Sequence, residues 1–383
     1  MDYLLTDEQK MARDMARKFA DSELKPIADR LDREHTHSPE VVKALGEMGV
    51  MGVAVPVEYG GGGMDYVSYA LIVSEISRAC GGTGTLVAAH NSLYCYPMLK
   101  FGTEEQKQKY LVPAASGQSV GCYALTEANA GSDPAALRTT AKLDGDSWVI
   151  NGEKKFISNG NIADYVVFAA TTDRSKGYKG ITQFVCDVRE TPGYKVGRVE
   201  EKMGINASGT AELIFEDARI PKENILGEPG SGLRQMLATL DSGRISIAAQ
   251  ALGIGRAVLE ESLEYAQQRE QFGRPISEFQ AIQWKLADMA TQLDAAELLI
   301  WRAALLEDKG FPFEKEAAMA KLFASDAAMH AAIEGVQILG GYGYCRDYPM
   351  ERHMRDAKIT QIYEGTNEIQ RLVIARNLLK KRK

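Results

Sequence analysis

The sequence predicts an α+β protein in which a small antiparallel β domain lies between two helical domains. Three observations support this prediction: helical spacing of apolar residues over roughly the first 115 residues, its loss from about 118 to 225, and its return after residue 229. A chain of 383 residues also exceeds what one compact core usually organises. We therefore expect an N-terminal helical domain at 1–117, a middle β domain at 118–228 and a C-terminal four-helix bundle at 229–383.

The N-terminal segment has two clear helix-start signals. Thr6 with Gln9, and Thr103 with Gln106, form capping boxes, in which paired side chains satisfy the free amides of a helix start. The glycine run at 60–63 has no Lys-Ser or Lys-Thr after it, so we expect a flexible turn rather than a phosphate cradle. After the first capping box, apolar side chains recur every four residues and predict one helix face: Met11, Met15 and Phe19.

The middle segment is rich in Thr and Val and contains turn dipeptides. Asp144-Gly145 and Asn151-Gly152 bracket the apolar run 147–150, which is a hairpin pattern. Further runs with strand character are 165–171, 181–188 and 210–215. A small antiparallel sheet follows from these patterns.

The C-terminal segment begins after the turn at 229–232 and is helical in pattern to its end. Its apolar residues advance by alternating fours and threes, as in long antiparallel helices that pack as a bundle. The residues that define this stripe are Ile282, Leu286, Met289, Leu293, Ala296 and Ile300.

Composition and charge exclude several classes of function. The net charge of −7 is spread along the chain without a basic stripe, which argues against a nucleic-acid partner. The five cysteines lie far apart with no zinc-like spacing, so we expect free thiols in a reducing compartment and no metal site. No apolar run approaches the ~20 residues that span a bilayer, and the acidic N-terminus has no signal or transit character. We therefore expect a cytoplasmic protein without membrane insertion.

Two segments of the middle domain are candidate ligand loops. Residues 121–133 combine small side chains, which let a planar ring approach the backbone, with the hydroxyls of Thr126 and Ser132. Residues 156–160 have a similar character. A dinucleotide would usually bind a GxGxxG turn after a strand, but the nearest candidate, Gly253 and Gly255, lies in a helical stretch and lacks the third glycine. Those two glycines indicate helix packing, and any dinucleotide must be held in another way.

Near the C-terminus, Glu364 stands between Tyr363 and Gly365. A carboxylate in such a position is a candidate general base if it is removed from water, because desolvation raises its pKa. The alternative is structural: Glu364 or Glu368 would occupy the first turn of a helix, where the helix dipole favours a negative charge. The residues alone leave both interpretations open.

Taken together, in this order and at this spacing, these segments resemble the acyl-CoA dehydrogenase family over essentially the whole chain, and above all its short-chain (butyryl-CoA) type. The resemblance implies an N-terminal helical domain, a middle β domain and a C-terminal four-helix bundle, usually in a homotetramer. It also implies an FAD cofactor. The implied partners are an acyl-CoA and an electron-transfer flavoprotein.

The resemblance assigns the FAD contacts residue by residue. The loop from Tyr123 to Ser132, which includes Leu125, and the segment from Phe156 to Ser158 would surround the flavin ring, with Thr126 near the reactive N5 edge and Phe156 over the ring. Arg269 would reach the FAD diphosphate of a neighbouring subunit. The remaining positions that match FAD contacts in the family are Gln271, Phe272, Gln280, Gln337, Gly340, Gly341, Thr366 and Glu368.

The substrate contacts and the base follow from the same resemblance. Glu364 matches the base that removes the α-proton, while flavin N5 takes the β-hydrogen as hydride and a 2-enoyl-CoA is formed. The Glu364 backbone amide would donate to the thioester carbonyl and so stabilise enolate charge. Some relatives place the base where this chain has Gly243. Positions expected at the thioester and pantetheine arm, or touching the substrate, are Ser132, Asp241, Arg244, Tyr363 and Gly365.

The acyl group and the electron acceptor are less constrained. The segment 87–94 matches the floor of the acyl pocket, where Ala88 and Ala89 would leave room for a compact branched or alicyclic group. His90 and Asn91 lie in this segment, and His90 fits packing as well as substrate contact. Two alternatives to the dehydrogenase remain: a flavin oxidase that uses oxygen, and a non-catalytic flavin- or CoA-binding protein. An acyl-CoA oxidase is usually longer at its C-terminus, and a binding protein should lack the base.

Overall fold

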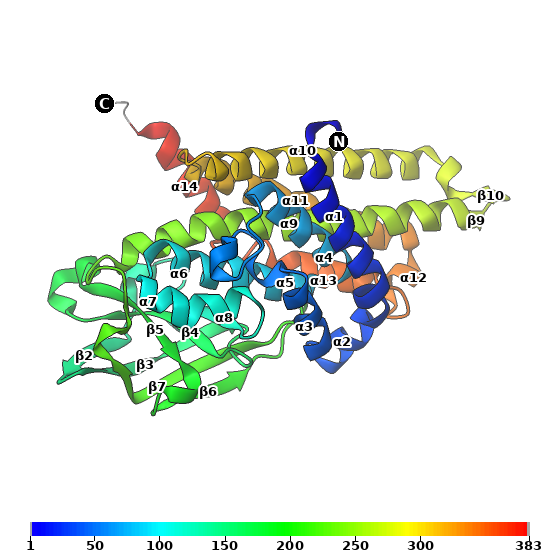
Figure 1. Cartoon of the computed structure of the whole chain (residues 1–383). Helices are drawn as coiled ribbons and strands as arrows, with labels where there is room; N and C mark the ends of the chain where they lie inside the picture. Colours follow the sequence, from blue (N-terminus) through cyan, green and yellow to red (C-terminus); the bar gives the residue numbers. More distant parts are fainter. Residues whose placement is uncertain (1, 381–383) are drawn as a thin grey trace.

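The structure is a computed structural model that describes residues 2–380, and it confirms the predicted α+β fold (Figure 1). Helices precede and follow a sheet of eight strands. The three domain boundaries themselves remain a prediction. The helices before the sheet are α1 Asp7–Phe19, α2 Ala28–Glu34, α3 Pro39–Glu47, α4 Tyr66–Ala79, α5 Gly81–Ala88, the π-helix η6 Ala89–Cys95, α6 Tyr96–Phe101, α7 Glu104–Gln106 and α8 Val112–Ala115.

The capping box predicted for the first helix is confirmed, but its predicted buried face is not confirmed at every position. Thr6 and Gln9 form the complete capping box, as do Thr103 and Gln106 before α7. The buried apolar positions of α1 are Ala12 and Ala16, whereas Met11 is 64% exposed. Met15 and Phe19 pack beside this alanine face, partly buried. The prediction for Met11 was wrong because small side chains, rather than large ones, form the face of α1 that packs against α4.

The sheet has the strand order β6-β7-β3-β2-β4-β5-β8, and β1 pairs with β4. Its ladders are antiparallel except that β4 runs parallel to β1 and, at one residue pair, to β2. The strands are β1 Gly121–Ala124, β2 Thr140–Asp144, β3 Ser147–Ser158, β4 Tyr165–Thr171, β5 Ile181–Asp187, β6 Tyr194–Val199, β7 Thr210–Pro221 and β8 Ile225–Leu226.

The two turn dipeptides of the middle segment have different outcomes. Asp144 pairs with Ser147 across a tight hairpin in which Gly145 has a φ of 62°, so the first turn is confirmed. The second prediction was wrong, because β3 continues through Asn151 and Gly152 with a shift of register. A Cβ at Gly152 would lie 2.4 Å from Thr139 Oγ1, so the glycine permits a close approach inside the sheet instead of a turn.

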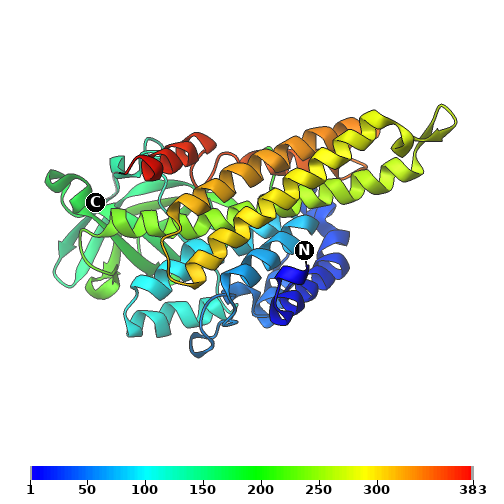
Figure 2. The same cartoon turned by 90° about the horizontal axis from the view of Figure 1, so that it is seen from above.

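The second helical region is built on three long helices that lie side by side (Figure 2). These are α9 Gly232–Gln268, α10 Gln280–Asp308 and α11 Glu314–Leu339, with a small hairpin, β9 Glu270–Gln271 and β10 Arg274–Pro275, between α9 and α10. The shorter helices α12 Gly341–Tyr344, α13 Met350–Ile359 and α14 Asn367–Leu379 complete the region.

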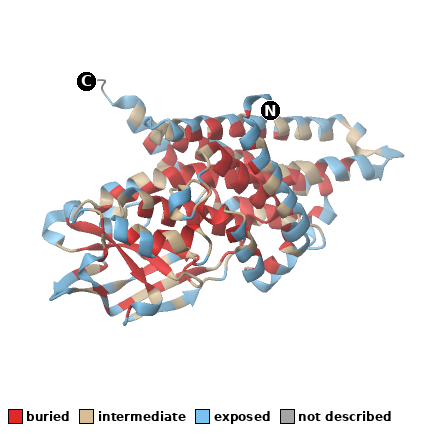
Figure 3. Ribbon diagram, viewed as in Figure 1, coloured by how far each residue is buried: buried red, intermediate tan, exposed pale blue. Residues whose placement is uncertain are grey.

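Helix α9 is the central element of the fold, because it packs against α4, α10 and α11. A Cβ at Gly253 would lie 2.1 Å from the carbonyl oxygen of Ser74 in α4, which confirms that this glycine serves helix packing. Burial is densest where these helices meet, and the β9–β10 hairpin at the far end is exposed (Figure 3). Among residues 2–380, no helix is both long and apolar enough to cross a bilayer.

Candidate active site

A cavity of about 600 Å³ lies between the sheet, the N-terminal helices and the loop that precedes α14. Residues of α5, η6 and α9 form its inner wall: Thr85, Ala89, Leu93, Leu240 and Ile247. Many positions singled out from the sequence line it together, namely Tyr123, Leu125, Thr126, Ser132, Phe156, Ser158, Tyr363, Glu364, Gly365 and Thr366. The structure thus brings the two candidate loops of the β domain and the candidate base to one space.

Glu364 lies on a turn with unusual backbone geometry. Its φ is 52° and that of Gly365 is 92°, so two consecutive residues occupy the left-handed region, which disfavours a glutamate. The turn is held from two sides. Gln370 donates from Nε2 to the carbonyls of Glu364 (3.2 Å) and Gly365 (2.9 Å), and Lys321 donates from Nζ to the Gly365 carbonyl at 2.8 Å. Strain of this kind persists only where surrounding contacts determine the conformation.

The Glu364 carboxyl points into the protein and is held away from water. Its Oε2 is buried and has no hydrogen-bond partner among the described residues. Burial raises the pKa of this carboxyl to about 8, although the charges of Lys321 and Arg244 act in the opposite direction. A Cβ at Gly243 would lie 1.9 Å from Oε2, so the carboxyl occupies the space that a side chain at 243 would need.

Glu364 and Glu368, for which the sequence left two interpretations open, lie in different surroundings. Glu368 is exposed in the first turn of α14, where backbone hydrogen bonds lower its pKa. Glu364 precedes that helix and faces the cavity. The structural role therefore fits Glu368, and the geometry of a base fits Glu364.

Asp241 and Arg244 do not line the cavity, although both were expected at the substrate. Arg244 is almost fully buried and forms an ion pair with Asp241 one helical turn before it in α9. Burial raises the pKa of Asp241 to about 6, which the Arg244 charge opposes. Arg244 acts on the cavity through its positive charge near Glu364.

The wall of the β domain is supported from behind by a buried ion pair. Lys154 is fully buried in β3, and its Nζ donates to the Leu125 carbonyl (3.3 Å) and to Glu127 Oε1 (2.7 Å). The next residue, Lys155, donates its backbone N–H to the Thr126 carbonyl at 2.8 Å. These contacts fix the loop that carries Thr126 against the end of β3, where Phe156 remains 64% exposed beside the cavity.

Gln250 of α9 joins two polar residues of the cavity wall, Tyr363 and Thr85. Tyr363 donates from its hydroxyl to Gln250 Oε1, and Gln250 donates from Nε2 to Thr85 Oγ1 at 2.7 Å. Thr85 and Tyr363 both line the cavity, so Gln250 holds two parts of its wall together. The sequence analysis did not identify Gln250, because nothing in its local pattern distinguishes it from other helical glutamines.

His90 has a structural role in the fold. The ring is fully buried, its Nδ1 accepts from the Gly121 N–H at 3.0 Å, and its Nε2 donates to the Ala114 carbonyl at 3.1 Å. The Asn91 side chain likewise bonds to the backbone, at Val53, Val50 and Val87. Of the two roles considered for His90, the packing role is the one its contacts support.

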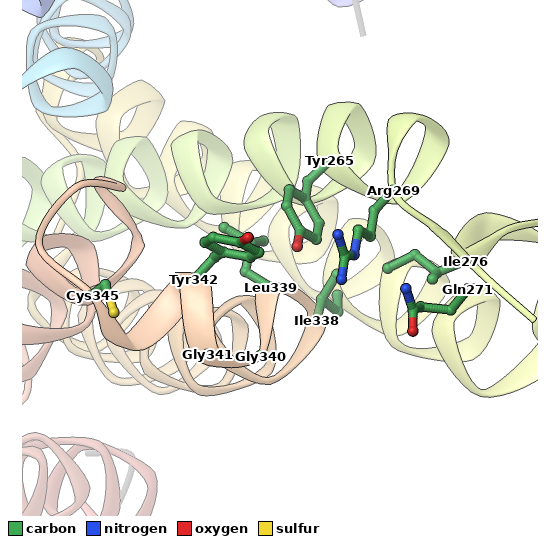
Figure 4. A pocket seen from close by; sticks show the side chains of 10 residues that line it. All are labelled: Tyr265, Arg269, Gln271, Ile276, Ile338, Leu339, Gly340, Gly341, Tyr342 and Cys345. Atoms are coloured by element: carbon green, nitrogen blue, oxygen red, sulfur yellow. The ribbon is translucent and has the colours of Figure 1, made fainter.

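A second hollow, of about 510 Å³, lies at the far end of the long helices (Figure 4). Arg269, Gln271, Gly340 and Gly341 line it, and Arg269 lies 5.7 Å from the ring centre of Tyr342. Gln280, Gln337 and Phe272 are not part of this lining, and Phe272 is 94% exposed in the hairpin. This hollow shares no lining residue with the cavity at Glu364.

Lys321 is a functional candidate that the sequence analysis missed. It lies on the stripe of α11 that carries Ala317, Ala324 and Ala328, all of them buried, and it is fully buried itself. The sequence signal for this residue was a lysine within an otherwise apolar helix stripe. That signal predicts burial but gives no role, because the role depends on the loop that Lys321 contacts.

Comparison with known protein families matches almost the whole chain. Three family models match in sequence order: the acyl-CoA dehydrogenase N-terminal domain at residues 6–118, the middle domain at 122–218 and the C-terminal domain at 230–379.

Curated relatives and solved structures agree with this match. A mitochondrial short-chain specific acyl-CoA dehydrogenase of Bos taurus is 53% identical over 98% of this chain and 91% of its own length. A short-chain specific acyl-CoA dehydrogenase of Clostridium acetobutylicum is 50% identical over 98% of this chain and 99% of its own length. The structure of butyryl-CoA dehydrogenase from Megasphaera elsdenii superposes with a TM-score of 0.97 at 46% identity, covering 99% of this chain and 100% of that one.

Proposed function

The chain belongs to the acyl-CoA dehydrogenase family, and from that premise we propose that Glu364 removes the α-proton of a short-chain acyl-CoA. The protein is an FAD-dependent oxidoreductase that dehydrogenates an acyl-CoA. The proposal concerns the base, the acyl group, the electron acceptor and the assembly that completes the cofactor site.

One observation supports the base above all others: the unpartnered, buried Oε2 of Glu364, which lies where Gly243 leaves space for it. The α-hydrogen of a thioester is only weakly acidic, so a base must be strong and well placed. A carboxyl whose pKa burial has raised to about 8 is a stronger base than an ordinary glutamate. The strained turn fixes its direction, which limits the loss of rate from misplacement.

The enolate that forms as the proton leaves needs hydrogen-bond donors at the thioester oxygen. Within residues 2–380, no backbone carbonyl accepts from the Glu364 N–H, so this amide is available to a ligand. We assign the carbonyl contact in part to this amide. Gly365 and Ser132, which also line the cavity, would contact the substrate, and Asp241 with Arg244 would support its thioester and pantetheine arm from behind.

The residues of the β-domain wall fit a flavin ring. Phe156 presents an exposed aromatic face at the cavity, and Thr126 and Ser158 place hydroxyl groups beside it. When bound, FAD supplies the acceptor for the β-hydrogen, which leaves the substrate as hydride. We place the flavin contacts at Tyr123, Leu125, Thr126, Ser132, Phe156, Ser158, Thr366 and Glu368.

The adenosine half of FAD would be held by a second copy of the chain. Among the described residues Arg269 forms no ion pair, which suits a guanidinium that meets a diphosphate from outside its own subunit. We place the contacts of this half at Arg269, Gln271, Phe272, Gln280, Gln337, Gly340 and Gly341. The active protein is therefore proposed to be a homo-oligomer, and a homotetramer by resemblance to the family.

The inner end of the cavity supports a short or compact acyl group. Two polar lining residues, Tyr363 and Thr85, are already bonded through Gln250, so this part of the wall is fixed and offers no free donor to a polar acyl group. Ala89 is a small residue of the same lining and leaves room for a compact group. The names of the bovine and Clostridium relatives, which specify short chains, agree with this proposal.

The proposed electron acceptor is an electron-transfer flavoprotein. A structure from Acidaminococcus fermentans that superposes with a TM-score of 0.98 at 50% identity comes from work on the electron transferring flavoprotein of that organism. Oxygen is the competing acceptor, and the rate of re-oxidation distinguishes the two.

Two measurements test the base and the substrate. The first is anaerobic bleaching of the flavin absorption by butyryl-, isobutyryl-, isovaleryl-, hexanoyl-, glutaryl- and cyclohexanecarboxyl-CoA, followed by re-oxidation with flavoprotein or oxygen. The second uses acetyl-CoA in D2O: this ligand has no β-hydrogen, so exchange of its α-hydrogens reports the base without any hydride transfer. We expect rapid bleaching by a short acyl-CoA, slow re-oxidation by oxygen and measurable exchange.

Glu364→Gln removes the base while retaining the shape of the side chain. This variant should retain FAD and ligand binding and lose both bleaching and exchange by about 10³-fold or more. Substantial exchange in the variant would exclude Glu364 as the base. A wild-type protein that no thioester bleaches would contradict the proposed substrate class.

A further inference from the structure

The β6–β7 segment (residues 200–206) forms one wall of the active-site cavity, because residues 200–205 all line it. It begins beside the proposed flavin contacts. The Glu200 N–H donates to the Thr210 carbonyl at 2.8 Å, and Thr210 pairs with Ser158 between β7 and β3. The β6–β7 segment is therefore the part of the wall that adjoins the proposed position of the flavin.

Two hydrogen bonds to α13 hold the middle of the β6–β7 segment. The Met203 carbonyl accepts from Arg355 Nη1 at 3.0 Å. The Ile205 N–H donates to Asp356 Oδ1 at 2.5 Å. Ile205 has a φ of 49°, a left-handed conformation that is rare for a β-branched residue. Such strain persists only where surrounding contacts determine the conformation, so helix α13 fixes the course of a segment that lies between two strands.

Arg355 also joins this wall to helix α2. Its Nη1 and Nη2 donate to Asp32 Oδ1 (3.1 Å) and Oδ2 (2.7 Å), and Asn206 of the segment donates from Nδ2 to the same Asp32 at 3.0 Å. Within α13, Nε and Nη2 of Arg355 donate to the Glu351 carboxylate at 2.7 and 2.8 Å. One arginine thus connects the N-terminal helices, the β6–β7 segment and the C-terminal helices.

The hydrogen bonds of Arg355 leave it no donor for a ligand. The bonds to Asp32, Glu351 and Met203 together use every N–H donor of the guanidinium. Arg355 lines the cavity, but its donors are all bound within the protein. Its contacts are those of a residue that positions a wall rather than one that binds substrate or cofactor.

We propose that Arg355 is a positioning residue for the flavin side of the cavity: it fastens the β6–β7 segment to both helical regions, and the fastened segment keeps oxygen away from the reduced flavin. The inference rests on the proposed flavin contacts, Phe156 and Ser158 among them. Oxygen that reaches a reduced flavin takes up two electrons and two protons, so hydrogen peroxide forms and the flavin is oxidised. A closed wall prevents such side reactions.

The inference predicts a pattern that general damage to the fold would not give. Loosening the β6–β7 segment should expose the flavin to oxygen and favour release of FAD, while the turn at Glu364 keeps its hydrogen bonds from Gln370 and Lys321. Oxidation by oxygen should therefore become faster, while α-hydrogen exchange from acetyl-CoA stays close to the wild-type rate. A purely structural role would lower the exchange and give no selective gain in the reaction with oxygen.

The test compares the wild type with Arg355→Lys, in which the lysine retains the charge but lacks the planar fork that holds several acceptors at once. Amide hydrogen exchange reports the segment directly and needs no catalysis. Protection at residues 200–208 should fall by roughly tenfold or more, because hydrogen bonds from a charged group are lost. FAD release on dialysis, and hydrogen peroxide formation by oxygen after reduction with stoichiometric dithionite, should both rise several-fold.

Arg78→Lys is the matched control for this comparison. Arg78 of α4 likewise binds several carboxylates, those of Asp21, Glu75 and Glu260, but it does not line the cavity. Its substitution should leave protection at 200–208 and the reaction with oxygen at their wild-type values. Equal changes in Arg78→Lys and Arg355→Lys would attribute them to a general loosening of the fold and overturn the inference.

Asn206→Ala is the second variant, because it removes one bond between the β6–β7 segment and Asp32 without changing a charge. It should shift the same readouts in the same direction by a smaller factor, and it decides the question if Arg355→Lys yields no FAD-loaded protein. Wild-type protection at 200–208 in these variants, or lost protection with no change in FAD release and peroxide formation, would overturn the inference. The proposed function is tested separately, because bleaching and exchange in the wild type need neither variant.

Discussion

Two arginines at different points along helix α9 mark two regions that differ in completeness. Arg244 is buried, forms an ion pair with Asp241 and lies near a cavity lined by residues of both helical regions and the β domain. Arg269 is the exposed residue at the end of the same helix and lies against Tyr342 in an open hollow. One region supplies its own ion-pair partners, whereas Arg269 in the other forms no ion pair among the described residues.

The two regions suit different chemical tasks within one architecture. Proton abstraction depends on a closed environment, because burial gives Glu364 its raised pKa. Recognition of a charged group depends on donors that remain free until the ligand arrives. The sheet and the β9–β10 hairpin lie at opposite ends of the bundle (Figure 1), with the cavity at Glu364 next to the sheet and the hollow at Arg269 beside the hairpin (Figure 4).

The largest predicted loss of activity follows from the substitution Gly243→Ala at the cavity. The new Cβ would overlap Glu364 Oε2, and Gly243 lies on a buried part of α9, so the carboxyl must move. Misplacement of about 1 Å costs on the order of 100-fold in rate. We expect that loss in acetyl-CoA exchange and in flavin bleaching, with FAD content unchanged.

Gly255→Ala provides the control on the same helix. Its Cβ would meet the end of the Leu293 side chain, which can move, and it lies away from Glu364. Exchange at the wild-type rate in Gly243→Ala would show that the carboxyl does not depend on this space. Equal losses in both variants would point to a general disturbance of α9.

Local sequence motifs predicted the helix starts and one hairpin turn of the fold correctly. The capping boxes at Thr6 and Thr103 and the hairpin at Gly145 depend on neighbours within a few residues, and all three are confirmed. The turn predicted at Gly152 was wrong, because the role of this glycine depends on its close contact with Thr139, which lies outside the dipeptide. Met11 was mispredicted since periodicity gives spacing but not the distance between packed helices.

The prediction of the cavity residues depended more on the family resemblance than on local sequence patterns. Residues around Glu364 offered two interpretations, because the space at Gly243 and the charges of Lys321 and Arg244 that act on its carboxyl come from residues far away in sequence. The family resemblance placed Thr126, Phe156 and Glu364 in one site, and the structure does bring them together. It did not reveal Lys321 or Gln250, whose importance depends on contacts between helices.

Arg269→Ala tests whether the hollow needs an external ligand. If Arg269 binds the diphosphate of FAD in another subunit, its loss should weaken FAD retention by roughly thirtyfold, since such charge-assisted contacts contribute about 2 kcal/mol. Glu364 chemistry should be intact in protein that keeps its FAD. FAD release during dialysis, with oligomeric state measured in parallel, provides the measurement.

Arg274→Ala is the matched control for that experiment. Arg274 lies in the hairpin that follows Arg269, stacks on Phe279 and pairs with Glu278, but it does not line the hollow. Similar FAD release from both variants would attribute the effect to the hairpin as a whole. Unchanged retention in Arg269→Ala would remove this arginine from the proposed cofactor site.

The smallest predicted effect is on the stability of the region around His90, whose hydrogen bonds connect η6 to β1 and α8. Burial lowers the pKa of His90 to about 4, below the value of about 6.5 expected in the unfolded chain. As the pH falls, His90 in the unfolded chain therefore takes up a proton before His90 in the folded protein does. Stability from the neutral ring is complete above about pH 6.5 and is lost as the pH drops toward 4. Acid should thus loosen the cavity region before it affects the hollow.

Amide hydrogen exchange at pH 7 and pH 5, corrected for the intrinsic rate, measures this difference between the two regions. In the wild type we expect protection of residues 114–124 to fall by roughly tenfold at pH 5, while residues 337–345 at the hollow change little. His90→Gln cannot take up the proton, so protection of 114–124 should become nearly independent of pH, whatever its absolute value. An equal loss of protection in both regions of the wild type, or the same loss in the variant, would mean that His90 is not the group that makes the cavity more sensitive to acid than the hollow.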